Sequence, residues 1–196
     1  MTEDKWLACK DRRKMVKHLK RRARGTDRVW RLFMAAFWIG NVPLLDLKRD
    51  RTTLVKRVTM LEVWAETGAH PKRLPKHRPP AVFLNSDVWE AVAETIRAAE
   101  GVAWGEAARP RHVALLRDIF GNPFRPVTFS PSWRTDTAVS LARGMYESRD
   151  FSAMPILADA LQDAGCDNDD VPNHCRDPKQ FHVRGCWVVD LVLGKQ

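Results

Sequence analysis

The sequence predicts an all-α protein, a compact irregular helical bundle of about eight helices. Apolar residues recur at helical spacing along most of the chain. Capping residues stand at the starts of these segments and glycines at their ends. No segment has the pattern of a strand with a partner strand elsewhere. Of the 196 residues, 44% are hydrophobic and 29% charged, which is typical of a globular chain and not of a disordered one.

Three helices are predicted in the first third of the chain, over residues 11–24, 27–42 and 52–67. Asp11 and Asp27 are suited to cap the first two, because a carboxylate accepts from the unpaired backbone N–H groups at a helix start. The first of these helices has only a narrow apolar stripe and is otherwise strongly positive. It is therefore expected to present a basic surface.

The remaining helices follow a loop that mixes prolines with positive charge. They are predicted over 87–99, 110–120, 130–148, 152–164, 169–175 and 183–193. The last segment is nearly all apolar, so its periodicity does not distinguish a buried helix from a buried strand. A helix is favoured there because the chain offers no partner strand.

The charge of the chain is unevenly distributed. Residues 1–80 hold 21 Lys and Arg against 8 Asp and Glu, whereas residues 81–196 hold 12 against 16. We therefore predict a basic N-terminal helical layer over 1–67, a linker loop over 68–84 and a C-terminal helical core over 85–196, which together form one or two domains. A positive half of this kind attracts polyanions or acidic partners.

The sequence predicts a cytoplasmic protein with no membrane partner. No apolar run of the secretory type follows Met1. The longest apolar run, 32–45, is interrupted by Asn41 and Pro43, and it is shorter than the roughly 20 residues that span a bilayer. Four cysteines in a chain without a secretory signal are expected to be reduced thiols.

Three runs in the C-terminal half carry a resemblance. Ala114–Val127 is ALLRDIFGNPFRPV, Pro155–Asp167 contains PILADAL and AGCD, and His182–Leu191 is HVRGCWVVDL. These runs resemble a large paralogous family of uncharacterised planctomycete proteins, as do Met1–Glu3 with Trp6–Cys9 and Arg31–Phe33, whereas residues 46–108 do not match it. The resemblance implies a bacterial, helical, intracellular protein. It implies no reaction, cofactor or functional residue.

A cluster of metal-ligand types lies near the C-terminus. Its members are Cys166, His174, Cys175, His182 and Cys186. Thiolates and imidazoles are the ligands that zinc prefers, and a structural zinc site needs four of them. The pattern lacks a C-x2-C knuckle, and the adjacent His174 and Cys175 are not expected to reach one ion from a helix. The alternative is that Cys166 and Cys186 are small buried apolar residues.

The basic N-terminal half is a candidate surface for phosphates. Its candidate residues are Lys14, Lys17, Lys20, Arg21, Arg22, Arg24, Arg57, Lys72 and Arg73. Phosphate contacts release counterions, so binding of this kind falls steeply with salt. Trp30, Trp38 and Trp64 are candidates for base stacking, although their helical spacing favours the core. No sequence-specific recognition motif is present, so any such binding is expected to be nonspecific.

No signature of an enzyme is recognised in the chain, neither a nucleophile elbow, a phosphate loop, a dinucleotide fingerprint nor a metalloprotease motif. We therefore expect a noncatalytic protein-binding or scaffolding module, whose unknown protein partner docks at the proline-fixed loop Asn122–Val127 or at the basic surface. The alternatives are nonspecific nucleic-acid binding through the basic N-terminal face and a small zinc-stabilised domain. Apart from zinc, no cofactor is expected.

Overall fold

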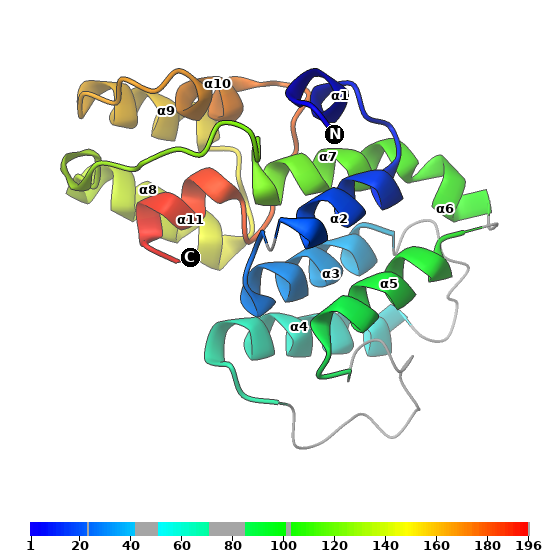
Figure 1. The fold of residues 1–196 in the computed structure, drawn as a ribbon. Coiled ribbons are helices and arrows are strands. Elements are labelled where there is room, and N and C mark those ends of the chain that lie inside the picture. Colours follow the sequence, from blue (N-terminus) through cyan, green and yellow to red (C-terminus); the bar gives the residue numbers. More distant parts are fainter. Residues whose placement is uncertain (23, 42–50, 71–84, 101–102, 196) are drawn as a thin grey trace. The chain divides into compact units, whose positions relative to one another are not determined.

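The computed structural model describes residues 1–22, 24–41, 51–70, 85–100 and 103–195 (Figure 1). Over these residues it contains eleven α-helices, one 3₁₀ turn and no strand, which confirms the predicted all-α class. Two of these helices, the short α1 (Glu3–Leu7) and α6 (Ala103–Ala107), were not predicted. Five residues are too few to show a helical period in the sequence.

The chain forms two compact units, Met1–Leu116 and Arg117–Gln196. The division falls within α7 (Arg109–Phe120) and not in the predicted linker, most of which lies outside the described residues. Residues 85–116 therefore group with the N-terminal helices, whereas the sequence placed them with the C-terminal core.

The N-terminal unit is built around α3. Its main helices are α2 (Arg12–Arg21), α3 (Asp27–Asn41), α4 (Arg51–Thr67) and α5 (Val88–Ala98). Helix α3 packs against α4 and α5, and α2 packs against α5. Large side chains are buried along the whole length of α3, including Trp30, Phe33 and Phe37. A helix that is apolar around most of its circumference must be covered on several sides, which explains its central place.

Helix α2 is amphipathic in an extreme form. The Asp11 carboxylate caps it by accepting from the backbone N–H groups of Arg13 and Lys14. Met15 and Leu19 on its inner side are fully buried, whereas most of its outward residues are cationic and exposed. Burial of this narrow stripe fixes the helix to the unit.

The C-terminal unit holds the end of α7 and four further helices. These are α8 (Asp136–Ser148), α9 (Met154–Asp163), α10 (Asp170–Arg176) and α11 (Trp187–Leu193). Helix α9 packs against α8 and α10, and α11 packs against α8 and α10. Leu157, Leu161, Val188 and Val189 are buried at the centre of this unit.

The predicted continuous helix over 130–148 is wrong. Pro131–Trp133 forms a 3₁₀ turn, after which Arg134 leaves the helical conformation at ψ 58°. Thr135 then caps α8 by accepting from the Ala138 N–H. The chain therefore changes direction between the two elements, and this change was hidden by the favourable Ser130-Pro131 start. By contrast, the ambiguous segment 183–193 contains a helix, α11, as favoured. Among the described residues, no helix is both long and apolar enough to cross a membrane.

Candidate metal centre

Four side chains of the C-terminal unit converge on one point. Asp118 lies near the end of α7, His174 lies on α10, and His182 and Cys186 lie in the segment that leads into α11, where Cys186 is the residue that precedes the helix. One donor atom from each of the four lies within 4.8 Å of the other three. The cluster thus joins three separate stretches of the chain.

The donor atoms face one another directly. Asp118 Oδ1 lies 2.7 Å from His182 Nδ1 and 3.2 Å from His174 Nε2. Cys186 Sγ lies 3.3 Å from the same nitrogen of His174 and 3.7 Å from that of His182. Each histidine therefore contacts both the carboxylate and the sulfur.

These distances are close to those of a tetrahedral zinc site. With zinc bonds of about 2.0–2.3 Å, neighbouring donor atoms of a tetrahedron lie roughly 3.3–3.6 Å apart. Three of the four distances above fall within about 0.2 Å of this range, and the fourth is a hydrogen bond that must lengthen by about 0.6 Å. One carboxylate, two imidazoles and one thiolate are all established types of zinc ligand.

The environment of Asp118 maintains its negative charge. Its burial would by itself raise the pKa of this carboxyl, but hydrogen bonds from His174 and His182 outweigh that effect and lower the pKa. Its second oxygen, Oδ2, accepts from the backbone N–H of Val183 at 3.0 Å. Asp118 is therefore ionised and oriented, as a metal-binding carboxylate must be.

The same four residues also resemble a nucleophile with its base and orienting acid, since Cys186 contacts a histidine that contacts Asp118. Burial argues against that role. The Cys186 side chain is fully enclosed, and its burial raises the thiol pKa. The side chains of Asp118 and His182 are 0% and 6% exposed. Nucleophilic cysteines need a substrate-accessible sulfur, whereas structural metal sites are closed.

The structure separates the five residues that the sequence grouped as ligands. It brings His174, His182 and Cys186 together, whereas the metal-ligand group that it forms does not include Cys166 or Cys175. Cys175 packs in the core, where burial raises its thiol pKa to about 12, and Cys166 contacts the backbone oxygen of Asn168. None of the four cysteines of the chain is in a disulfide.

Asp118 is the ligand that sequence reasoning missed. It precedes His174 by 56 residues, so no spacing rule connects the two. One signal was present, because Asp118 lies between the buried Leu116 and Ile119 on α7. An acidic residue on the apolar stripe of a helix needs a buried partner.

The predicted phosphate-binding residues lie in different environments. Lys14, Lys17, Lys20, Arg21, Arg22 and Arg24 are exposed on α2 and directly after it. Arg57 is half-buried on α4, and Lys72 and Arg73 lie outside the described residues. Trp30, Trp38 and Trp64 are buried, so these three tryptophans are core residues and not stacking platforms for bases.

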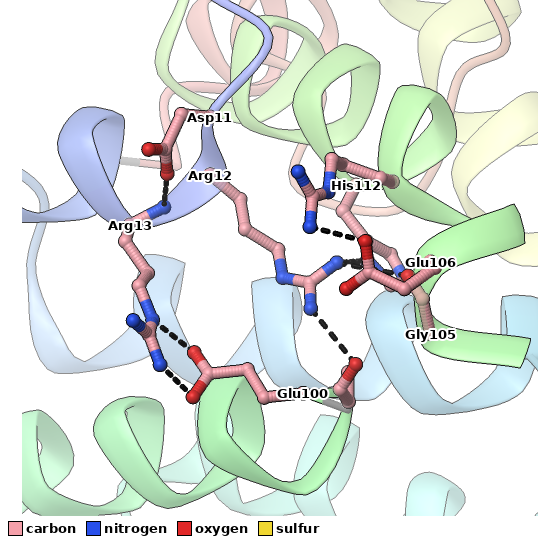
Figure 2. A network of polar contacts seen from close by, with 9 residues as sticks. Asp11, Arg12, Arg13, Glu100, Gly105, Glu106 and His112 are labelled. Carbon is pink, nitrogen blue, oxygen red and sulfur yellow. Dashed lines mark hydrogen bonds and ion pairs between the residues drawn. The ribbon is translucent and has the colours of Figure 1, made fainter. Parts of the chain in front are cut away.

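A second buried polar cluster lies in the N-terminal unit (Figure 2). The Arg12 guanidinium donates to the carbonyl oxygens of Ala99 and Gly105 at 3.0 and 2.9 Å, and to His112 Nδ1 at 3.1 Å. The other ring nitrogen of His112 lies against the side-chain amide of Asn41. Burial and the nearby Arg12 charge lower the pKa of His112 to about 3, so the imidazole is neutral and accepts from Arg12. These groups satisfy one another, which makes the cluster a structural one.

Comparisons with models of protein families, with curated proteins and with solved structures found no match for this chain. The chemistry of the chain's own residues is therefore the basis for a functional argument. The Asp118–His174–His182–Cys186 cluster is the feature that combines suitable ligand types with suitable geometry.

Proposed function

We propose that the C-terminal unit is a zinc-stabilised domain of a noncatalytic module. The ligands are Asp118, His174, His182 and Cys186, and the observation that carries the proposal is the approach of their four donor atoms to within 4.8 Å of one another. The ion links α7 to α10 and to the segment before α11. Its role is structural, because the side chains around it are buried.

The stabilising effect follows from the connectivity of the site. The segment from Asp177 to Gly185 has no regular secondary structure, and Val183 and His182 within it contact the Asp118 carboxylate. In the unfolded chain the four ligands are far apart, so zinc binds the folded state in preference and its binding energy adds to folding. A reducing, cytoplasmic compartment is part of the proposal, because the thiolate must stay unoxidised.

The experiment is a metal titration of the purified protein with matched cysteine variants. We expect about one zinc per chain by elemental analysis, and a melting temperature that falls when a chelator removes the metal. Cobalt in place of zinc should give a thiolate-to-metal absorption band. The Cys186→Ala variant should lose the stoichiometric metal, the absorption band and the effect of the chelator.

Cys175→Ala is the control, because Cys175 is an equally buried thiol of the same unit that lies outside the cluster. It should keep one metal per chain even if its melting temperature falls. Asp118→Asn should weaken zinc binding, because an amide is a much poorer zinc ligand than a carboxylate. Protein that takes up no zinc, or that loses it equally in both cysteine variants, would contradict the proposal.

The other expectations from the sequence stay predictions. In the loop predicted to dock a protein partner, Asn122 Oδ1 accepts from the backbone N–H of Phe124, and Pro123 is buried. These two contacts hold the start of the loop against the unit, which supports its use as a preformed docking site. The kinship to the planctomycete family also stays a prediction.

A further inference from the structure

The outward side of α2 carries a dense set of cations. We call Arg13, Lys14, Lys17, Lys20 and Arg21 the basic face, and all five are exposed. Asp11, the cap of α2, is the nearest acidic residue in the sequence, and the helix itself contains no acidic residue. The basic face belongs to the N-terminal unit and is separate from the candidate metal centre.

Three of the five cations have no acidic partner within the part of the chain that the structure describes. Arg13 pairs with Glu100, and Lys14 lies 3.9 Å from Asp11. No ion pair is described for Lys17, Lys20 or Arg21. Lys20 contacts the ring of Trp89 at 5.4 Å, which orients the ammonium group without neutralising it.

The basic face is held on a rigid support. Arg12, Met15 and Leu19 anchor the opposite side of α2 in the unit, and Arg12 does so through three hydrogen bonds. The cations therefore project from a fixed helix and not from a mobile tail. Preorganised charges lose less conformational entropy when they bind a partner.

The average density of charge on the basic face is close to that of a nucleic-acid strand. Five cations on the ten residues of α2 give about one charge per 3 Å of helix axis, at 1.5 Å of rise per residue. Along one strand of duplex DNA a phosphate recurs every ~3.4 Å. A membrane-surface helix needs exposed apolar side chains beside its cations, and the α2 residues beside the basic face include none of this kind.

We propose that the basic face of α2 binds the phosphate backbone of nucleic acid without reading its sequence. Trp30, Trp38 and Trp64, the candidates for base stacking, are buried. Binding therefore rests on electrostatic attraction between the cations and the phosphates. This inference does not depend on the zinc site. Its signature is a strong dependence of affinity on salt, since each phosphate contact releases a counterion.

The test is fluorescence anisotropy of labelled oligonucleotides of two unrelated sequences, with the full chain, between about 50 and 150 mM salt. Four to five phosphate contacts predict roughly a hundredfold loss of affinity over this range and similar affinities for both sequences. Replacing Lys17, Lys20 and Arg21 by Gln should reduce the log–log salt slope by about 2 to 3, because each removed contact contributes about 0.7 to 0.9.

A triple variant of the exposed Lys56, Arg143 and Lys179 to Gln is the control, because it removes the same net charge outside α2. It should keep the wild-type slope. Circular dichroism and the melting temperature should be unchanged in both variants, as all six positions are on the surface. Absence of binding at 50 mM salt would overturn the proposal. Equal losses of affinity in the two triple variants would also overturn it. A third test is competition by an excess of polyglutamate, of anionic vesicles or of unlabelled nucleic acid. If unlabelled nucleic acid does not displace the labelled oligonucleotide, the proposal is wrong.

Discussion

The buried, neutral His112 should make the N-terminal unit less stable in mild acid, because the unfolded chain takes up a proton there that the folded chain refuses. The imidazole is 1% exposed, stacks on Phe37 with ring centroids 4.0 Å apart, and accepts a hydrogen bond from the Arg12 guanidinium. A proton on Nδ1 would remove this acceptor and place a second buried cation beside Arg12. The pKa of His112 is accordingly lowered from 6.5 to about 3.

The size of the effect follows from these two pKa values. The unfolded chain takes up the proton near pH 6.5 and the folded chain only near pH 3. The contribution to stability is therefore present above pH 6.5 and is lost as the pH falls toward 3. It amounts to about 2 kcal/mol between pH 7 and pH 5, because each pH unit below 6.5 costs about 1.4 kcal/mol.

The assay is urea unfolding of the wild type and His112→Asn at pH 7 and pH 5. Asparagine can place an amide oxygen where Nδ1 accepts from Arg12, but it does not titrate. The wild type should lose about 2 kcal/mol more than the variant between the two pH values, and all other titrating groups cancel in this comparison. Parallel losses would refute the reasoning. An independent check is the ring-proton NMR signal of His112, which should not shift between pH 8 and pH 5.

Further predictions concern packing in each unit. Gly105→Ala should lower the free energy of unfolding by about 2 kcal/mol or more, because a Cβ would lie 1.9 Å from the Ala99 carbonyl oxygen. Gly144→Ala should raise the free energy of unfolding by about 0.5–1 kcal/mol, because nothing lies near its Cβ and alanine favours a helix over glycine. Denaturant unfolding of the two variants should show these opposite signs. Leu157→Ala should lower the free energy of unfolding by about 2–5 kcal/mol, because the Leu157 side chain is fully buried. Ile156→Ala on the same helix should lower it by less than about 1 kcal/mol, because Ile156 is 58% exposed. Similar losses at both positions would mean that α9 packs differently.

The sequence predicted most of the long helices because their ends carry strong local signals. Asp11 caps α2 as expected, and α5 also begins directly after a capping aspartate, Asp87. The break at Arg134 was missed because it depends on the conformation of one residue, and the favourable Ser-Pro start gave no sign of it. The unpredicted α1 and α6 are too short to have a period.

The candidate site was only partly predictable for a different reason. His174, His182 and Cys186 are close in sequence, so a search for ligand types finds them, but it finds Cys175 as well. Neighbours on a helix point about 100° apart, so His174 and Cys175 cannot both face the cluster. Asp118 comes from a helix 56 residues earlier, and only the tertiary fold brings it to the site.

The unequal burial of the four thiols has a practical consequence for labelling. Cys9 in the N-terminal unit and Cys166 in the C-terminal unit are half-buried, whereas Cys175 and Cys186 are enclosed. A brief treatment with a maleimide dye should therefore modify one position in each unit and leave the enclosed pair intact. The natural chain thus accepts a donor and an acceptor fluorophore without any substitution, and energy transfer between them would report how the separation of the two units responds to zinc or to an oligonucleotide.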